Sequence, residues 1–291
     1  MITLSKVLVT GARGLLAPYL IRDLQRLGCQ VFATTRSAGD YDCDLTNAAA
    51  TGVLLRAINP DLVINCAALT DVEYCESHAT LSELVNAASV RHLVRALKKD
   101  AKLMHISTDH VYSGERELNK EDEAAPINVY GKTKLLGECE AMKHEKTVVA
   151  RVNFFGKSLI KGKRSLSDWA LDMLLSGNFI DGFTDNFFSP LSLPSLSSLL
   201  VNVAHEDICG IYNIGSRNGM SKAAFLQELA NQNGLDVSAI RMTKCASIIG
   251  RTRRPEDLRM DVSAIETAIG LSMPSLEEEI IGCCFRGGEK F

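Results

Sequence analysis

The sequence predicts an α/β fold, with a doubly wound parallel sheet and a smaller C-terminal lobe. Three observations support it. Short β-branched runs alternate with longer amphipathic runs over about the first 150 residues, as in strand–helix units. The strand runs are continuously apolar, which is typical of parallel strands that are covered on both faces. After Arg151 the alternation loosens, which indicates a second lobe.

Each expected element follows from a local pattern. Lys6–Thr10 reads KVLVT, and the next apolar run carries Leu16, Leu20 and Leu24 at a helical spacing. Asn59-Pro60 ends the second helix, because proline disfavours a helical residue before it. The expected strands cover 6–10, 30–34, 62–66, 102–107, 147–151 and 210–214. The expected helices cover 15–27, 48–58, 80–99, 129–144, 167–175, 222–233 and 275–281.

Composition excludes several classes of protein. The 291 residues are 46% apolar and 23% charged, as in an ordinary globular protein. The formal net charge of −3 argues against a nucleic acid or an acidic membrane as partner. We expect no transmembrane helix and no signal peptide, because no apolar run approaches 18 residues and the N-terminus reads as a strand. The nine cysteines have no C-x-x-C or zinc-ligand spacing, which favours reduced thiols and a cytoplasmic protein.

A glycine-containing turn lies between the first strand and the first helix. Gly11, Arg13, Gly14 and Leu15 fall in the run TGARGLLA. Glycines there let backbone N–H groups approach a pyrophosphate, and the helix N-terminus adds positive potential. A tight strand–helix turn without a ligand would read the same way. In this context the turn favours a dinucleotide-binding domain over residues 1–151, and a second lobe over 152–291 that returns to the sheet near 187–215.

The end of the second strand bears on the choice of cofactor. It reads Thr34-Thr35-Arg36, with no acidic residue before Asp40. An acid at this position would bind the ribose hydroxyl of NAD, whereas an arginine accepts the 2′-phosphate of NADP. Arg36 and Arg13 therefore favour NADPH over NADH, although solvated surface arginines are the alternative.

The second chemical signal is Tyr130 and Lys134, four residues apart on one helical face. An ammonium next to a tyrosine lowers the phenol pKa, which makes it useful for proton transfer. The pair alone is weak, but Thr108 ends the preceding strand at the same edge of the sheet. His105 and His110 flank that strand end without metal-ligand spacing, so we expect no metal. Arg251, Arg253 and Arg254 form either a diphosphate clamp or a plain surface cluster.

In combination these motifs resemble the extended short-chain dehydrogenase/reductase superfamily. The likeness within it is to dTDP-4-dehydrorhamnose reductases and similar nucleotide-sugar 4-ketoreductases, and it covers nearly the whole chain. The motifs that carry it are TGARGLLA (10–17), DL (44–45), VINCAALTDVEYCE (63–76), VN (85–86), ISTDHVYSG (106–114), YGKTKLLGE (130–138) and RRPEDLRMD (253–261).

The resemblance implies a Rossmann-like fold and specific site roles. Thr108, Tyr130 and Lys134 would be the catalytic triad, and the tyrosine and lysine would also contact the cofactor. The other cofactor-binding residues would be Gly11, Arg13, Gly14, Leu15, Arg36, Asp44, Leu45, Ala67, Ala68 and Asn86. The residues facing the sugar nucleotide would be Asp109, His110, Asn153, Phe154, Phe188 and Arg254.

The function expected from this reading is NADPH-dependent reduction of a nucleotide-linked 4-keto-6-deoxy sugar in deoxysugar or polysaccharide biosynthesis. Two alternatives stay open: a nucleotide-sugar epimerase or 4,6-dehydratase, and a non-catalytic NADP-binding regulatory subunit. Dehydratases of this kind carry Asp-Glu after the strand-end threonine, whereas this chain has Asp109-His110. A homodimer through the helices at 80–99 and 129–144 is one arrangement that the sequence allows.

Overall fold

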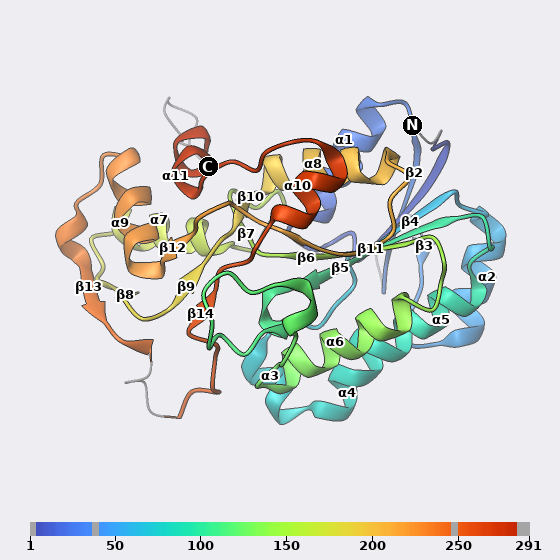
Figure 1. Cartoon of the computed structure of the whole chain (residues 1–291), viewed down its shortest axis with the longest axis horizontal. Helices are drawn as coiled ribbons and strands as arrows, with labels where there is room; N and C mark the ends of the chain where they lie inside the picture. The colour runs from blue at the N-terminus through green and yellow to red at the C-terminus, as the bar shows by residue number, and fades with distance from the viewer. Residues whose placement is uncertain (1–3, 37–40, 246–249, 284–291) are drawn as a thin grey trace.

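A computed structural model describes residues 4–36, 41–245 and 250–283 of the chain (Figure 1). At its centre lies a seven-stranded sheet in the order β11-β6-β5-β4-β1-β2-β3, and neighbouring strands are parallel throughout. The strands are β1 (Lys6–Thr10), β2 (Gln30–Thr35), β3 (Tyr41–Asp42), β4 (Leu62–Asn65), β5 (Lys102–Thr108), β6 (Thr147–Val152) and β11 (Gly210–Ile214).

Helices cover both faces of this sheet (Figure 1). Alternate strand residues point to opposite faces, so Val7 and Val9 belong to one hydrophobic core and Leu8 to the other. The first core includes residues of α1 (Ala17–Arg26), α8 (Leu193–His205) and α10 (Ser263–Ile269). The second includes residues of α2 (Ala48–Ile58), α5 (Ser89–Ala96) and α6 (Val129–Ala141). The predicted doubly wound, Rossmann-like architecture is confirmed.

The strand order places a crevice at one point of the sheet. From β1 the chain proceeds outward to β2 and β3, and then returns to β4 on the other side of β1. The connections that leave the carboxyl ends of β1 and β4 therefore diverge to opposite faces. Ligands of open α/β sheets bind at such a switch point.

The C-terminal lobe has its own apolar core, which includes Phe155, Phe188 and Phe225. The lobe lies beyond the carboxyl ends of the central strands, at the left in Figure 1. Its helices are α7 (Leu166–Leu175), α9 (Lys222–Gln232) and α11 (Leu276–Gly282). Its strands are β7 (Phe154–Phe155) with β10 (Leu191–Ser192), β8 (Ile180–Phe183) with β13 (Ile240–Thr243), and β9 (Phe187–Phe188) between β12 (Met220–Ser221) and β14 (Asp257–Leu258). Strand β11 returns the chain to the sheet beside β6, while the domain boundary at residue 151 stays a prediction.

Several elements differ from the expectation. Helix α1 begins at Ala17 rather than Leu15, because the turn after β1 extends to Leu16 and Pro18 occupies the first helical turn. The helix expected at 80–99 runs from 79 to 96 as α4 (Ala79–Glu83), a π-helical segment (Leu84–Ala88) and α5. Helices α3 (Val72–Ser77), α8 and α10 were not predicted.

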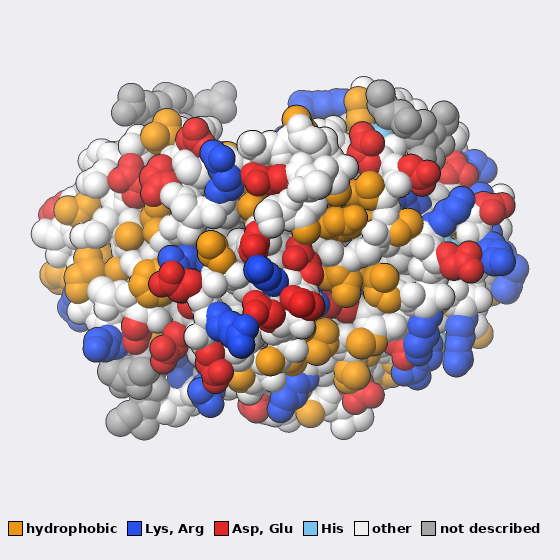
Figure 2. Space-filling model, viewed as in Figure 1, with side chains coloured by type: hydrophobic (Ala, Val, Ile, Leu, Met, Phe, Trp, Pro, Cys, Tyr) orange, Lys and Arg blue, Asp and Glu red, His pale blue; other side chains and the backbone are white. Residues whose placement is uncertain are grey.

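The surface carries charged side chains of both signs. Figure 2 shows positive and negative side chains interspersed on this face, in keeping with the small net charge. Across the described residues, no helix has both the length and the apolar character that crossing a bilayer requires. The described cysteines are free thiols, and Cys284 and Asp40 lie outside the described residues.

Candidate active site

A cleft of about 810 Å³ lies at the carboxyl ends of β1, β4, β5 and β6, and residues of the C-terminal lobe complete its lining. The predicted site residues that line it are Gly14, Leu15, Ala68, Thr108, Asp109, His110, Tyr130, Lys134, Asn153, Phe154 and Arg254. The structure therefore brings the predicted catalytic residues and part of the glycine turn into one cavity. Gly11, Arg13, Arg36, Asp44, Leu45, Ala67, Asn86 and Phe188 are not among its lining residues.

The glycine turn has the geometry of a phosphate cradle. Gly11 has a φ of +65°, and a Cβ on it would lie 2.7 Å from the backbone N of Ala67. The N–H of Gly14 donates to the Gly11 carbonyl at 2.8 Å, which closes the turn directly before helix α1. Buried Thr10 donates to Asn65 at 2.5 Å and accepts from the N–H of Ala67 at 3.3 Å, which joins the ends of β1 and β4. The close approach of the Ala67 backbone thus requires a glycine at position 11, and it holds the turn against the end of β4 directly before helix α1, where these residues fit a dinucleotide pyrophosphate.

The residues predicted for the adenosine end lie in the turn after β1 and just beyond the ends of β2 and β3. Arg13 and Arg36 are exposed, and Leu45 is buried. The Asp44 carboxylate accepts from the hydroxyl and N–H of Thr46, and these bonds lower its pKa, with a smaller contribution from Arg36. Arg36 and Asp44 are thus close enough to interact, and both stay accessible to a ligand.

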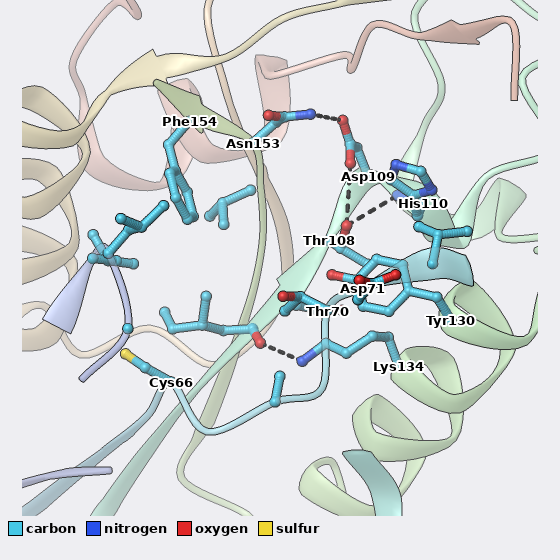
Figure 3. Close-up of a pocket in the computed structure, with 18 of the residues that line it drawn as sticks. Cys66, Thr70, Asp71, Thr108, Asp109, His110, Tyr130, Lys134, Asn153 and Phe154 are labelled. Atoms are coloured by element: carbon cyan, nitrogen blue, oxygen red, sulfur yellow. Dashed lines mark hydrogen bonds between the residues drawn. The ribbon is translucent and has the colours of Figure 1, made fainter. Parts of the chain in front are cut away.

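The three predicted catalytic side chains converge from β5 and α6 (Figure 3). Tyr130 and Lys134 are buried, with 8% and 2% exposure, at the start of α6. The Lys134 ammonium donates to the Ile106 carbonyl at 2.7 Å. Thr108 ends β5, and its hydroxyl donates to Asp109 at 3.1 Å and accepts from the N–H of His110 at 3.2 Å.

The electrostatics of Tyr130 differ from the expectation. Burial raises its pKa above the ordinary value of a phenol, and the opposing influence is a hydrogen bond with Thr108 rather than the Lys134 ammonium. Burial also lowers the pKa of Lys134 to about 8, against an opposing effect of Glu138. Tyr130 is therefore protonated at neutral pH, and Lys134 is mostly cationic.

The wall beside the triad is polar and buried. Asn153 donates to the carboxylate of Asp109, and both residues line the cleft (Figure 3). Burial raises the pKa of Asp109 to about 6. The His110 ring lies edge-on to Tyr130 with centroids 5.4 Å apart, and burial lowers its pKa to about 3. His110 is therefore a neutral donor or acceptor, and its Nδ1 has no hydrogen-bond partner among the described residues.

The remaining predicted substrate contacts divide between cleft and core. Arg254 lines the cleft and forms an ion pair with Glu73 of α3 at 3.4 Å. Phe188 is 1% exposed and packs against Phe225, so its side chain belongs to the core of the lobe. Asn86 is buried in the π-helical segment, where its amide binds the backbone of Leu69.

Sequence reasoning missed several residues near the cleft. Asp71, Glu73, Lys163 and Arg164 line it, and the last two come from the basic loop between β7 and α7. Lys222, at the start of α9, interacts electrostatically with Asp109 and His110, and burial lowers its pKa to about 8. The sequence shows that Lys222 follows Ser221, which caps helix α9. The sequence does not show that the fold brings Lys222 near Asp109 and His110, at the end of β5.

Comparison with known proteins agrees with this architecture. The family described as RmlD substrate binding domain matches residues 5–285. A probable low-salt glycan biosynthesis reductase of Haloferax volcanii is 29% identical over 286 residues, which cover 94% of this chain and 95% of that protein. The crystal structure of a dTDP-4-dehydrorhamnose reductase from Clostridium acetobutylicum superposes with a TM-score of 0.87, at 26% identity over 96% of this chain and 98% of that one. A Bacillus anthracis dTDP-4-dehydrorhamnose reductase, crystallised with NADP, has a TM-score of 0.88 at 24% identity, covering 97% and 99%.

Fold and cleft together define a Rossmann-like α/β protein with a candidate active site at the switch point of its sheet. The family match spans nearly the whole chain, and the chain belongs to the RmlD substrate-binding domain family. The resemblance inferred from the motifs is thereby confirmed.

Proposed function

We propose that this protein is an NADPH-dependent reductase of a nucleotide-linked 4-keto-6-deoxy sugar, acting in deoxysugar or polysaccharide biosynthesis. The observation that carries the proposal is one cleft that holds Thr108, Tyr130 and Lys134 together with Gly14 and Leu15 of the glycine turn. The relatives named as dTDP-4-dehydrorhamnose reductases support this substrate class.

The residues at the cleft can divide the chemistry between them. A bound NADPH supplies a hydride to a carbonyl carbon, and the protein supplies position and protons. Gly11 and Gly14 would hold the diphosphate, and Arg36 the 2′-phosphate, of the cofactor. Thr108 would donate a hydrogen bond to the carbonyl oxygen, and Tyr130 would give that oxygen its proton.

Lys134 would have two tasks. Its ammonium lies one helical turn from Tyr130, and by turning from the Ile106 carbonyl toward the phenol it would stabilise the negative charge that forms as the phenol loses its proton. It would also donate to the nicotinamide ribose. Both tasks require the charged form, which is the majority form at pH 7 for a pKa of about 8.

The state of His110 bears on the 4,6-dehydratase alternative. A dehydratase must also remove a proton from carbon, and His110 occupies the position after Asp109 where a base would be needed. Its pKa of about 3 makes it a weak base. This favours reduction over elimination in this cleft.

We further propose a cytoplasmic location, on the free thiols of the described cysteines. A homodimer stays a prediction. Leu81, Leu84 and Leu136 are each at least 40% exposed on the helices named for it.

A panel of nucleotide-linked sugars tests the proposed function. Each is incubated with purified protein and NADPH, and oxidation is followed by the loss of absorbance of the reduced nicotinamide. We expect 4-keto-6-deoxy compounds to be reduced and 4-hydroxy compounds to be inert. A protein that binds NADPH but reduces none of them would fit the regulatory-subunit alternative instead.

A further inference from the structure

A buried ion pair borders the strand end that carries Thr108, and the proposed reaction does not use it. Glu138 of α6 and Arg151 of β6 each have side chains only 1% exposed. Arg151 Nη2 is 2.7 Å from Glu138 Oε2, and its Nε is 3.1 and 3.2 Å from the two carboxylate oxygens. Buried pairs of this kind add little stability over apolar residues of the same size, because both charges lose their hydration. A role other than stability is therefore worth seeking.

Glu138 is connected to the proposed catalytic residues in two ways, through helix α6 and through the end of strand β5. It follows Lys134 by four residues, so both side chains lie on one face of α6. Its Oε1 accepts a hydrogen bond from the hydroxyl of Ser107. Ser107 lies between Ile106 and Thr108 in the chain. The carbonyl of Ile106 accepts the hydrogen bond from Lys134. Glu138 thus contacts the stretch of β5 that holds both other groups.

Glu138 is also the anion that acts on Lys134. Burial lowers the pKa of Lys134, and the largest opposing effect is the charge of Glu138. Cys66, at the end of β4, has a pKa of about 12 and is a neutral thiol at pH 7. His105, on β5, has a pKa well below its ordinary value, so it is neutral as well. Tyr130 is protonated, so Glu138, the ion-pair partner of Arg151, is the anion among the described residues whose charge favours the Lys134 ammonium.

Arg151 fixes the orientation of that carboxylate. Besides Glu138, its guanidinium donates to the hydroxyl of Tyr112 at 2.8 Å and to the backbone carbonyl of Glu121 at 2.7 Å. Tyr112 in turn donates to Asn213 of β11 at 2.6 Å. Nη1 thus binds Tyr112 and Glu121 while Nε and Nη2 bind Glu138, so the carboxylate is held in one orientation by a fixed guanidinium.

We propose that Glu138 is a positioning residue that keeps the Lys134 ammonium charged at neutral pH, and that Arg151 holds Glu138 in the orientation this requires. For the role of Lys134 in turnover the inference rests on the proposed function. The charge on Lys134 itself can be measured without any substrate.

The test compares three variants with the wild type. Glu138→Gln keeps the shape and removes the charge. Because it leaves Arg151 unpaired and risks misfolding, the double variant Glu138→Leu with Arg151→Met replaces the whole pair with apolar groups. Glu140→Gln is the matched control, because Glu140 lies on the same helix but pairs with Arg91 and Lys143 at 3.0 and 2.7 Å.

The first readout is the pH dependence of Lys134 acetylation by limiting acetic anhydride, quantified by mass spectrometry. Lys134 lines the cleft, so a small reagent can reach it. In Glu138→Gln we expect the midpoint to fall by about one pH unit or more. Such a fall raises the uncharged fraction at pH 7 about fivefold. In the double variant, which also removes the positive charge of Arg151, we expect a smaller fall in the same direction. An unchanged midpoint in folded Glu138→Gln, or in the double variant if Glu138→Gln does not fold, would overturn the inference.

The second readout is the pH profile of kcat/KM with a sugar substrate identified by the panel. Loss of the Lys134 charge defines an alkaline limb, which should move to lower pH in both charge-removing variants and stay in place in Glu140→Gln. A purely structural role would lower kcat/KM at every pH without moving that limb, and this also contradicts the inference. A shifted acetylation midpoint in a protein that reduces no sugar would support the role of Glu138 and refute the proposed function.

Discussion

Replacing Asp109 with asparagine should make the protein more stable at neutral pH. The Asp109 side chain is 1% exposed, and its pKa is raised from 3.8 to about 6, chiefly by burial. A raised pKa means that the folded protein prefers the protonated acid, so folding stability is lost as pH rises through 6. At about 1.4 kcal/mol per pH unit, the ionised carboxylate costs up to about 3 kcal/mol above pH 7. Asparagine removes that cost and keeps the size of the side chain.

The assay is urea denaturation of wild type and Asp109→Asn at pH 8 and pH 5. We expect the variant to gain up to about 3 kcal/mol at pH 8 and about half of that at pH 5, where the wild-type carboxyl is largely protonated. The exposed Asp172→Asn serves as control and should show no such difference between the two pH values. If the stability difference for Asp109→Asn is the same at both pH values, the reasoning about its burial is refuted.

Three further predictions concern the cofactor. Arg36→Ala should weaken NADPH binding ten- to a hundredfold, the value of a charge-assisted pair of about 1.5–3 kcal/mol, and leave NADH unchanged; equal affinities of the wild type for both cofactors, measured by fluorescence titration, would contradict this. Gly11→Ala should abolish NADPH binding, because the new Cβ would lie 2.7 Å from the backbone of Ala67. Gly28→Ala is the control, because Gly28 has a comparable φ of +82° but open space around it. In a parallel titration Gly28→Ala should bind NADPH normally, although its backbone strain is similar. Lys134→Met should lower both turnover and NADPH affinity, and a variant that loses turnover alone would remove the ribose contact from the account.

The fold was largely predictable because its strongest signals are local. Buried parallel strands such as β5, where all seven residues are buried, read as unbroken apolar runs. Helix α8 was missed because its start contains serines and Pro194, which resemble a loop. Ser192 caps that helix, and Pro194 lies in its first turn, where a missing N–H has no cost. The π-helical segment at Leu84–Ala88 leaves no mark in hydrophobic spacing.

The sequence predicted the site residues that lie at one strand end or within one helical turn. It did not predict the residues that reach the site from a distant part of the chain. Thr108, Tyr130 and Lys134 meet because β5 and α6 are sequential neighbours on one edge of the sheet. Lys222 approaches Asp109 from the other lobe, and no local pattern encodes that approach. Phe188 was expected at the substrate, but the same aromatic character that suggests a binding wall also suits the interior of the lobe, where it lies.

The measurement that tests the central claim most directly is the stoichiometry of NADPH oxidation with a nucleotide-linked 4-keto-6-deoxy sugar. We predict one NADPH consumed for each ketone reduced, and a rate about 10²–10⁴ times lower for Tyr130→Phe, which should still fold and bind cofactor. Tightly retained NAD⁺ after purification, with a 4-keto product formed from a 4-hydroxy sugar nucleotide and no net consumption of cofactor, would contradict the account. Near-wild-type reduction by Tyr130→Phe would contradict the role assigned to its phenol.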